Sequence, residues 1–333
     1  MAITVSACRA HLFKWCGQDG TPHKQVKLLP RARCHRKLTI VLSCDYDCSS
    51  QIFSNGTSLG RRMLLLTACL PVMTLENDVN LFRSNNRSNL LAVEVEEVEI
   101  QAIKSEIRKV LSKAKAAGLL RLVFHDAGTF DMAKNTGGMN GSIIYELNRP
   151  ENTGLERSVK VLQKVKAVLD LAMQVSWADL IALAGAEAVA LCGGPDIPVR
   201  LGRQDKESPD PEGELPVESL NAAGLIECFQ KKGFSTQDLV ALSGAHTLGN
   251  KGFGKPTSFD NSYFHTLLEK PWLKASNGEM GKMIGLPSDH ALVEDEECLR
   301  WITTYANDQR RFFDDFTVSY IKLVNSGVNW KNI

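Results

Sequence analysis

The amino-acid sequence predicts an all-α protein, with one mostly helical domain of about 240 residues behind a long N-terminal tail. Two observations support this prediction. Beyond Asn89, apolar residues recur with the spacing of amphipathic helices, and no alternating apolar–polar stretch of useful length indicates a strand. The apolar fraction of 44% and the charged fraction of 23% are typical of a globular protein, so a wholly disordered chain is excluded.

The first two helices are expected between residue 89 and residue 130. The first is marked by apolar residues three or four positions apart, which are Ile100, Ile103, Ile107, Val110 and Leu111. Gly118 is expected to separate it from a second helix, which carries Arg121 and His125. The segment 131–140 is rich in Gly and Asn, and this composition predicts a loop.

Two further helices are expected in the middle of the chain. One is marked by apolar residues with helical spacing, namely Val159, Leu162, Val165, Val168 and Leu169. The next, Trp177 to Leu191, is nearly apolar throughout, which predicts a buried helix ended by the Gly-Gly-Pro at 193–195. The stretch 195–216 mixes proline, glycine and charged residues and is expected to be a loop.

The last part of the chain contains two more predicted helices. A helix from Thr236 to Leu248 has a capping residue in Ser235 or Thr236 and an acidic first turn at Asp238. It is expected to end at the glycine-rich stretch 249–254, just after His246. A long final helix is expected over 294–325, and the pattern leaves open whether it is interrupted.

Residues 1–80 are predicted to be a targeting region, and the domain proper is expected over 90–333. Up to Ser43 the tail contains eight Lys or Arg residues and a single acidic residue, Asp19, which is typical of an organelle transit peptide. The expected destination is the chloroplast stroma, with the thylakoid lumen left open. The alternative is a disordered tail that contains no targeting signal.

A second signal is conceivable within the tail. Arg61-Arg62 precedes a short apolar run, a pattern found in twin-arginine export signals. Pro71 breaks this run, which favours its being the end of the transit region. The run is shorter than the roughly 20 residues that cross a bilayer, so no stable membrane span is expected.

Charge and cysteine content exclude other classes. The formal net charge of +1 implies no nucleic-acid partner. Six of the nine cysteines lie in the first seventy residues, and only Cys192, Cys228 and Cys298 follow, without metal-ligand spacing. A disulfide framework is therefore not expected, and the domain is predicted to work in a reducing compartment.

Two histidines lie in segments that suit one active site. His125 follows Arg121 by four residues, so on a helix their side chains lie one turn apart on the same face. A permanent cation beside an imidazole that can accept a proton suits the cleavage of a polar O–O bond. His246 is available as a metal ligand.

The chain from about residue 95 onward resembles the class I plant-type haem peroxidases, on the ascorbate peroxidase branch. Five segments occur in the order of that family: Arg121–Thr129, Ala178–Gly185, Leu242–Gly249, Phe259–Phe264 and Leu286–Leu292. The resemblance implies a peroxidase fold in which two helical layers enclose one haem b. It also implies that hydrogen peroxide is reduced with electrons from a small donor, ascorbate or a phenolic compound, in the defence against oxidative stress.

The resemblance assigns a role to several residues. His246 would be the proximal ligand of the haem iron, and Asp289 would accept a hydrogen bond from its other nitrogen. The alternative for Asp289 is a helix N-cap after the proline turn. His125 would move the proton of the peroxide and Arg121 would stabilise the departing oxygen. Asn152 would fix the tautomer of His125, and Glu146 is a looser candidate for orienting Asn152.

The chain also departs from the family pattern. Phe124 stands where most class I enzymes have tryptophan before the distal histidine; it would keep the apolar wall of the haem pocket but offers no N–H. Pro256 lies where a second tryptophan is expected. The arginine that pairs with ascorbate has no clear counterpart beyond Lys251 and Lys255, whereas Lys113 matches the other ascorbate-contacting position.

The resemblance further implies a cation site for potassium or calcium near the proximal histidine. Its ligands would be Thr247, Thr257 and Asp260, although a shortened loop removes part of the usual ligand set.

Three hypotheses on the function of the protein stay open. The first is a haem peroxidase whose donor is not securely ascorbate, the second a typical L-ascorbate peroxidase, and the third a non-catalytic haem-binding or regulatory protein.

Overall fold

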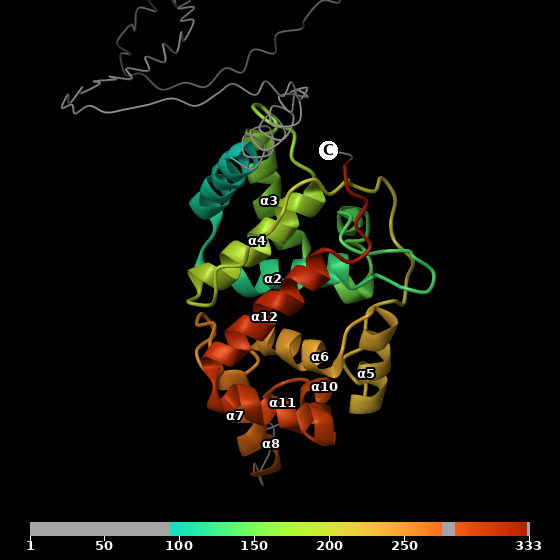
Figure 1. Ribbon diagram of the computed structural model, residues 1–333, viewed down its shortest axis with the longest axis vertical. Coiled ribbons are helices and arrows are strands. Elements are labelled where there is room, and N and C mark those ends of the chain that lie inside the picture. Colours follow the sequence, from blue (N-terminus) through green and yellow to red (C-terminus); the bar gives the residue numbers. More distant parts are fainter. Residues whose placement is uncertain (1–93, 275–283, 332–333) are drawn as a thin grey trace, which may run out of the picture. The chain divides into compact units, whose positions relative to one another are not determined.

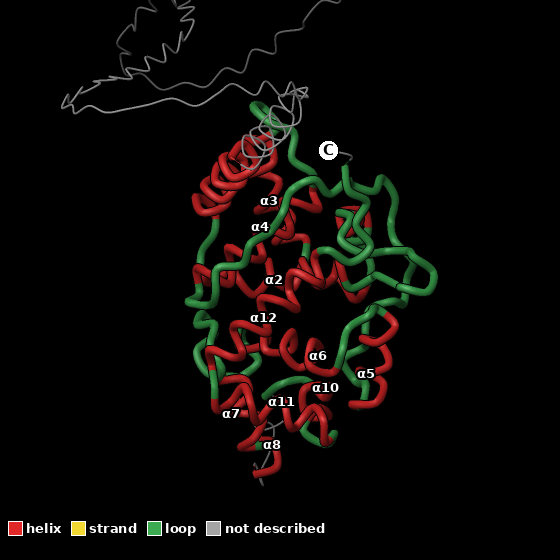
Figure 2. The backbone as a smooth tube through the Cα atoms, in the orientation of Figure 1, coloured by secondary structure: helices red, strands yellow, loops and turns green. Residues whose placement is uncertain are grey.

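The computed structural model describes residues 94–274 and 284–331, which belong to one compact unit spanning Val72–Ile333. The predicted targeting region 1–80, including the Arg61-Arg62 pair, lies outside the described residues and stays a prediction. Within the described ranges the chain forms helices joined by loops, as Figure 2 shows, and only two isolated β-bridges occur there. The predicted all-α class is confirmed.

The helices form two groups, which Figure 1 shows above and below one long helix, α12 (Gln309–Val324). The upper group contains helix 94–110, α2 (Lys113–Ala127), α3 (Glu156–Leu169) and α4 (Trp177–Leu191). The lower group contains α5 (Ala222–Lys231), α6 (Thr236–Ser243), α7 (Ser262–Glu269), α8 (Pro271–Lys274), α10 (Pro287–Leu292) and α11 (Glu296–Asn307). Helix α12 contacts both α2 and α6, so it links the two layers.

Local capping explains where several helices begin. The hydroxyl of Ser176 accepts a hydrogen bond from the N–H of Asp179 at the start of α4. Ser235 and Asp238 form a reciprocal capping box at the start of α6, where the sequence pattern predicts a cap. The predicted final helix is interrupted, because the carboxylate of Asp308 caps a new helix, α12.

Gly118 does not separate two helices, and this prediction was wrong. The break comes earlier, at residues 111–112, and α2 continues through Gly118. A Cβ at Gly118 would lie 2.8 Å from the Oγ of Ser158 in α3, so the glycine allows two helices to pack closely. The predicted helix 236–248 also ends earlier, at Ser243, and continues as the short 3-10 helix η3 (Gly244–Thr247).

One close contact ties the upper layer to the linking helix. A Cβ at Gly185 in α4 would overlap with the hydroxyl of Tyr320 in α12 and with a methyl of Val123 in α2. The absence of a side chain there lets the buried Tyr320 donate a 2.7 Å hydrogen bond to the carbonyl of Ala182. Three helices therefore meet at a single glycine.

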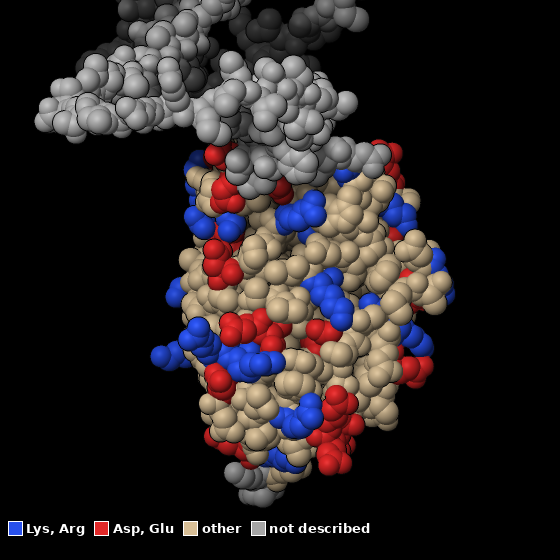
Figure 3. Space-filling view, viewed as in Figure 1, with Lys and Arg blue, Asp and Glu red and all other residues tan. Residues whose placement is uncertain are grey.

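The surface carries both signs of charge. On the face in Figure 3, basic and acidic side chains are interspersed, so this face gives no single-sign field that would steer an ion. Within the described ranges, no helix combines the length and apolar character that crossing a membrane requires.

We expect Gly185→Ala to destabilise the domain by about 1–3 kcal/mol, because the new methyl group overpacks the junction of α2, α4 and α12. The matched control is Gly224→Ala in α5, whose Cβ would meet first the mobile end of Leu220. Because alanine favours a helix over glycine, this control should leave stability within about 1 kcal/mol or raise it. Urea unfolding measures both variants, and equal stability of the two would contradict the packing account.

Candidate active site

A cavity of about 410 Å³ lies between the two layers and is lined by both histidines that the sequence singles out. Residues of α2, including Arg121, Phe124 and His125, line one part of it. His246 and residues of α6 line another, and Figure 1 shows α2 and α6 on opposite sides of α12. The remaining lining is largely apolar, with Leu120, Val123, Leu225, Phe229, Leu239 and Leu242 among its members.

Helix α2 holds the Arg121 and His125 side chains against each other, as the four-residue spacing predicts. The Nε of Arg121 donates to the Nε2 of His125 at 3.2 Å. The two other guanidinium nitrogens donate to the backbone carbonyls of Thr153 at 2.9 Å and Glu151 at 2.6 Å. The guanidinium is therefore fixed in place beside the imidazole.

Asn152 determines the tautomer of His125. The Nδ2 of Asn152 donates to the backbone carbonyl of Glu146 at 2.9 Å, so its Oδ1 is the acceptor that lies 2.7 Å from the Nδ1 of His125. His125 therefore carries its proton on Nδ1 and presents a lone pair on Nε2. The sequence suggested that Glu146 orients Asn152, and the structure shows this contact through the backbone of Glu146.

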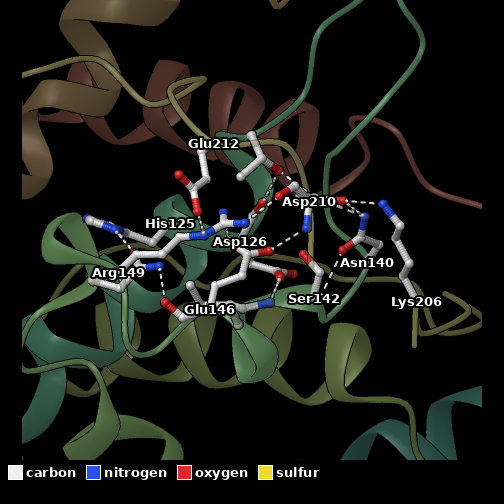
Figure 4. A network of polar contacts seen from close by, with 12 residues as sticks. His125, Asp126, Asn140, Ser142, Glu146, Arg149, Lys206, Asp210 and Glu212 are labelled. Carbon is white, nitrogen blue, oxygen red and sulfur yellow. Dashed lines mark hydrogen bonds and ion pairs between the residues drawn. The ribbon is translucent and has the colours of Figure 1, made fainter. Parts of the chain in front are cut away.

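The carboxylate of Glu146 belongs to a buried polar network that holds this loop (Figure 4). It accepts hydrogen bonds from Arg149 at 2.8 Å and from the N–H of Asp210 at 2.8 Å. Arg149 in turn donates to the backbone carbonyl of Asp210. Arg149 and Asp210 were not predicted from the sequence, because the partners are 61 residues apart and no short motif joins them.

Asp126, the neighbour of His125, also lies in this network. Burial, with the charges of Asp210 and Glu146, raises the pKa of Asp126 to about 8, although the N–H groups of Gly141 and Ile143 donate to it. The neutral acid is therefore the main form at pH 7. The side chain next to His125 consequently adds little negative charge there.

The environment of His125 favours the neutral imidazole. Burial lowers the pKa of His125 to about 4. The hydrogen bond that His125 donates to Asn152 opposes this shift, and the positive charge of Arg121 adds to it. His125 is therefore uncharged at physiological pH, and its basic nitrogen is Nε2, which accepts from Arg121. Its protonated form would be more acidic than an ordinary imidazolium and would give the proton back readily.

On the other side of the cavity, His246 contacts Asp289. The Nδ1 of His246 donates to the Oδ1 of Asp289 at 2.7 Å, and the Oδ2 accepts from the N–H of Leu286 at 2.8 Å. Asp289 is thus the partner of the histidine, as the resemblance implies. It is not the N-cap of α10, which is Leu286, but as the third residue of that helix it accepts from the N–H of the N-cap residue. Among the described residues, the Nε2 of His246 has no hydrogen-bond partner.

Each member of this pair shifts the pKa of the other. Burial opposes a charge on His246, but the charge and the hydrogen bond of Asp289 outweigh it and raise the pKa of His246. Burial likewise opposes the charge of Asp289, yet His246 and the other donors lower its pKa. The side chain of His246 is 40% exposed, because it faces the cavity, whereas that of Asp289 is 2% exposed.

A third side chain, Tyr263 of α7, joins this pair and was not assigned a role from the sequence. Its hydroxyl donates to the Oδ1 of Asp289 at 2.9 Å. Burial, with the charge of Asp289, raises the pKa of Tyr263 well above its usual value, so the hydroxyl keeps its proton. Tyr263 occurs in a segment that carries the family resemblance, but the spacing to Asp289 gave no signal of their contact.

Only some of the remaining predicted residues line the cavity. Phe124 lines the cavity, lies edge-on to His125 with ring centroids 6.2 Å apart, and stacks on Phe229. Lys251 also lines the cavity, whereas Lys113 and Lys255 are exposed and do not. Pro256 lies in a loop whose ends are joined by a hydrogen bond from the N–H of Gly249 to the carbonyl of Pro256.

Only two of the three predicted cation ligands come together. The hydroxyl of Thr247 donates to the Oδ1 of Asp260 at 3.1 Å. Thr257 is exposed and makes no side-chain hydrogen bond within the described ranges. No group of three or more His, Cys, Asp or Glu that could hold a metal occurs there either. A potassium or calcium ion stays a prediction.

The cavity residues fit a haem. An apolar space with an imidazole nitrogen of His246 left free, backed by a carboxylate on its other nitrogen, is the donor set that binds haem iron. His125 is less suited to binding iron, because Arg121 already donates to its Nε2. The two histidines are thus chemically distinct.

Comparison with known proteins agrees with this geometry. Residues 100–308 match the family model described as Peroxidase. An Arabidopsis thaliana protein named "Putative L-ascorbate peroxidase 6" is 65% identical over 228 residues, which cover 68% of this chain and 69% of that protein. "L-ascorbate peroxidase 5, peroxisomal" of the same plant is 41% identical over 244 residues, which cover 69% of this chain and 83% of that protein. "L-ascorbate peroxidase 2, cytosolic", again from Arabidopsis thaliana, is 38% identical over 241 residues, which cover 68% of this chain and 92% of that protein.

The names of two of these relatives mention the peroxisome and the cytosol. They do not bear on the chloroplast location expected from the first 80 residues of this chain. That location stays a prediction.

We expect the imidazole of His125 to titrate near pH 4, and Asn152→Asp to move this titration to higher pH. A carboxylate in place of the amide favours the charged imidazolium, so the pKa rises. NMR titration of ¹⁵N-histidine-labelled, haem-free protein measures both values, with His265→Ala and His125→Ala used to assign signals. A His125 pKa near 6.5 in the unmutated protein would contradict the electrostatic account.

Proposed function

Because the chain belongs to the peroxidase family, we propose that it is a haem enzyme that reduces hydrogen peroxide to water with electrons from a small-molecule donor. The single observation that supports this most is the arrangement of Arg121, His125 and Asn152 on one side of the cavity, with His246 and Asp289 at another part of it. The proposal is supported because residues suited to proton transfer and a histidine suited to binding iron line the same cavity. The roles of the individual residues are part of the proposal.

His125 is proposed to move the proton of the peroxide. Its neutral Nε2 takes the proton from one oxygen and then delivers it to the other oxygen, which leaves as water. Because its pKa is low, the imidazole is uncharged at the start and its conjugate acid returns the proton readily. Asn152 keeps the proton of Nδ1 in place, so that only Nε2 takes part.

Arg121 is proposed to stabilise the negative charge that grows on the departing oxygen. Its guanidinium is already held by two backbone carbonyls, so little reorganisation is needed when the charge appears. The bond from its Nε to His125 must be exchanged for the peroxide. Apolar neighbours such as Phe124 strengthen these interactions by excluding water.

His246 is proposed to hold the haem through the Nε2 that faces the cavity, with Asp289 increasing the basicity of the imidazole. A bound haem would supply, through its iron, the electrons that break the O–O bond, and would take them back from the donor. The reaction consumes one peroxide, two electrons and two protons, and yields two waters.

The donor is proposed to be ascorbate or a phenol. The names of the relatives favour ascorbate, since three of them are called L-ascorbate peroxidases. The cavity itself offers Lys251 as a cation for an anionic donor, and an apolar lining that suits an aromatic ring. Both donors are therefore tested side by side.

We expect the haem-loaded, unmutated protein to oxidise at least one of these donors in the presence of hydrogen peroxide. His125→Ala should lower kcat/KM for hydrogen peroxide by roughly 10²–10⁴-fold, which is the usual contribution of a positioned acid–base group. Steady-state absorbance assays with ascorbate and with a phenol measure this effect.

The matched control is His265→Ala, which removes an exposed histidine of α7. It should leave the rate unchanged. If the unmutated protein oxidises neither donor, or if His125→Ala reacts as fast as the control, the proposed function is wrong.

A further inference from the structure

The carboxylate of Asp289 is shared between two donors at a single oxygen atom. Its Oδ1 accepts from the Nδ1 of His246 at 2.7 Å and from the hydroxyl of Tyr263 at 2.9 Å. Its Oδ2 is occupied by the N–H of Leu286 at 2.8 Å. Every hydrogen bond that Asp289 accepts from another donor reduces the charge available to attract the proton of His246.

The position of Tyr263 is fixed by packing. The residue is fully buried, and its ring lies edge-on to that of His246, with centroids 6.0 Å apart and an interplanar angle of 83°. Phe253 and Phe264 contact it at centroid distances of 4.7 and 5.0 Å, also edge-on. The phenol therefore has little freedom to leave Asp289, and its hydroxyl is a permanent donor there.

We infer that Tyr263 is a positioning residue that sets how strongly Asp289 polarises the proximal histidine. By sharing Oδ1, its hydroxyl limits the anionic character of the His246 imidazole and so keeps the reduction potential of a bound haem iron higher than Asp289 alone would set it. This inference rests on the proposed function, because it takes His246 as the iron ligand. A merely structural role, in which the hydroxyl only satisfies a buried carboxylate, would leave the iron unaffected.

The test is Tyr263→Phe, which removes the hydroxyl and keeps the ring. In the haem-loaded protein, the reduction potential is measured by spectroelectrochemical titration, and the iron–histidine stretch of the ferrous form by resonance Raman spectroscopy. We expect the potential to shift downward and the stretching frequency to shift upward, because Asp289 then acts on His246 with one competing donor fewer.

Two further variants make the result unambiguous. Tyr305→Phe is the matched control, since Tyr305 is an equally buried neighbour of Phe264 whose hydroxyl donates to Asp315, and it should shift neither value. Asp289→Asn should shift both values in the direction opposite to Tyr263→Phe. If Asp289→Asn shifts them and Tyr263→Phe does not, the inference is overturned while the proposed function stands. If no iron–histidine stretch from His246 is observed at all, the proposed function fails as well.

Discussion

The hydrogen bond from the Nδ1 of His246 to Asp289 decides which nitrogen of that histidine faces the cavity, and the rest of the site depends on this choice. It turns Nε2 toward the apolar space and leaves it without a partner among the described residues. It also links η3 to α10 across 43 residues of chain, so the histidine and its carboxylate partner come from separate elements of the lower layer. A buried charge is tolerated because three donors surround Asp289.

At the opposite part of the cavity, the surroundings of His125 shift its pKa in the other direction. Asp289 favours a charge on His246, whereas burial and Arg121 keep His125 neutral. Two residues of one type therefore have pKa values displaced in opposite directions by the groups packed around them. The network of Glu146, Arg149 and Asp210 contributes at a distance, since it holds the loop from which Asn152 reaches His125.

Much of this arrangement could be predicted from the sequence, where it depends on residues that are close together along the chain. The helical period located helix 94–110 and α3, and the nearly apolar run 177–191 located α4. A four-residue spacing placed Arg121 beside His125. Gly118 was misinterpreted because a glycine that permits helix packing has the same local appearance as one that ends a helix. Helix α5 and helix α7 were missed, since they are short and flanked by mixed sequence. Contacts such as Tyr263 with Asp289 depend on tertiary packing, and no spacing reveals them.

The central claim is that a single imidazole, that of His246, binds the iron while His125 stays unligated. The electron paramagnetic resonance spectrum of the ferric, haem-loaded protein at pH 7 tests this most directly. The account predicts a high-spin signal, because only one strong axial ligand is present. A low-spin signal from two coordinated imidazoles, lost in His125→Ala, would contradict it.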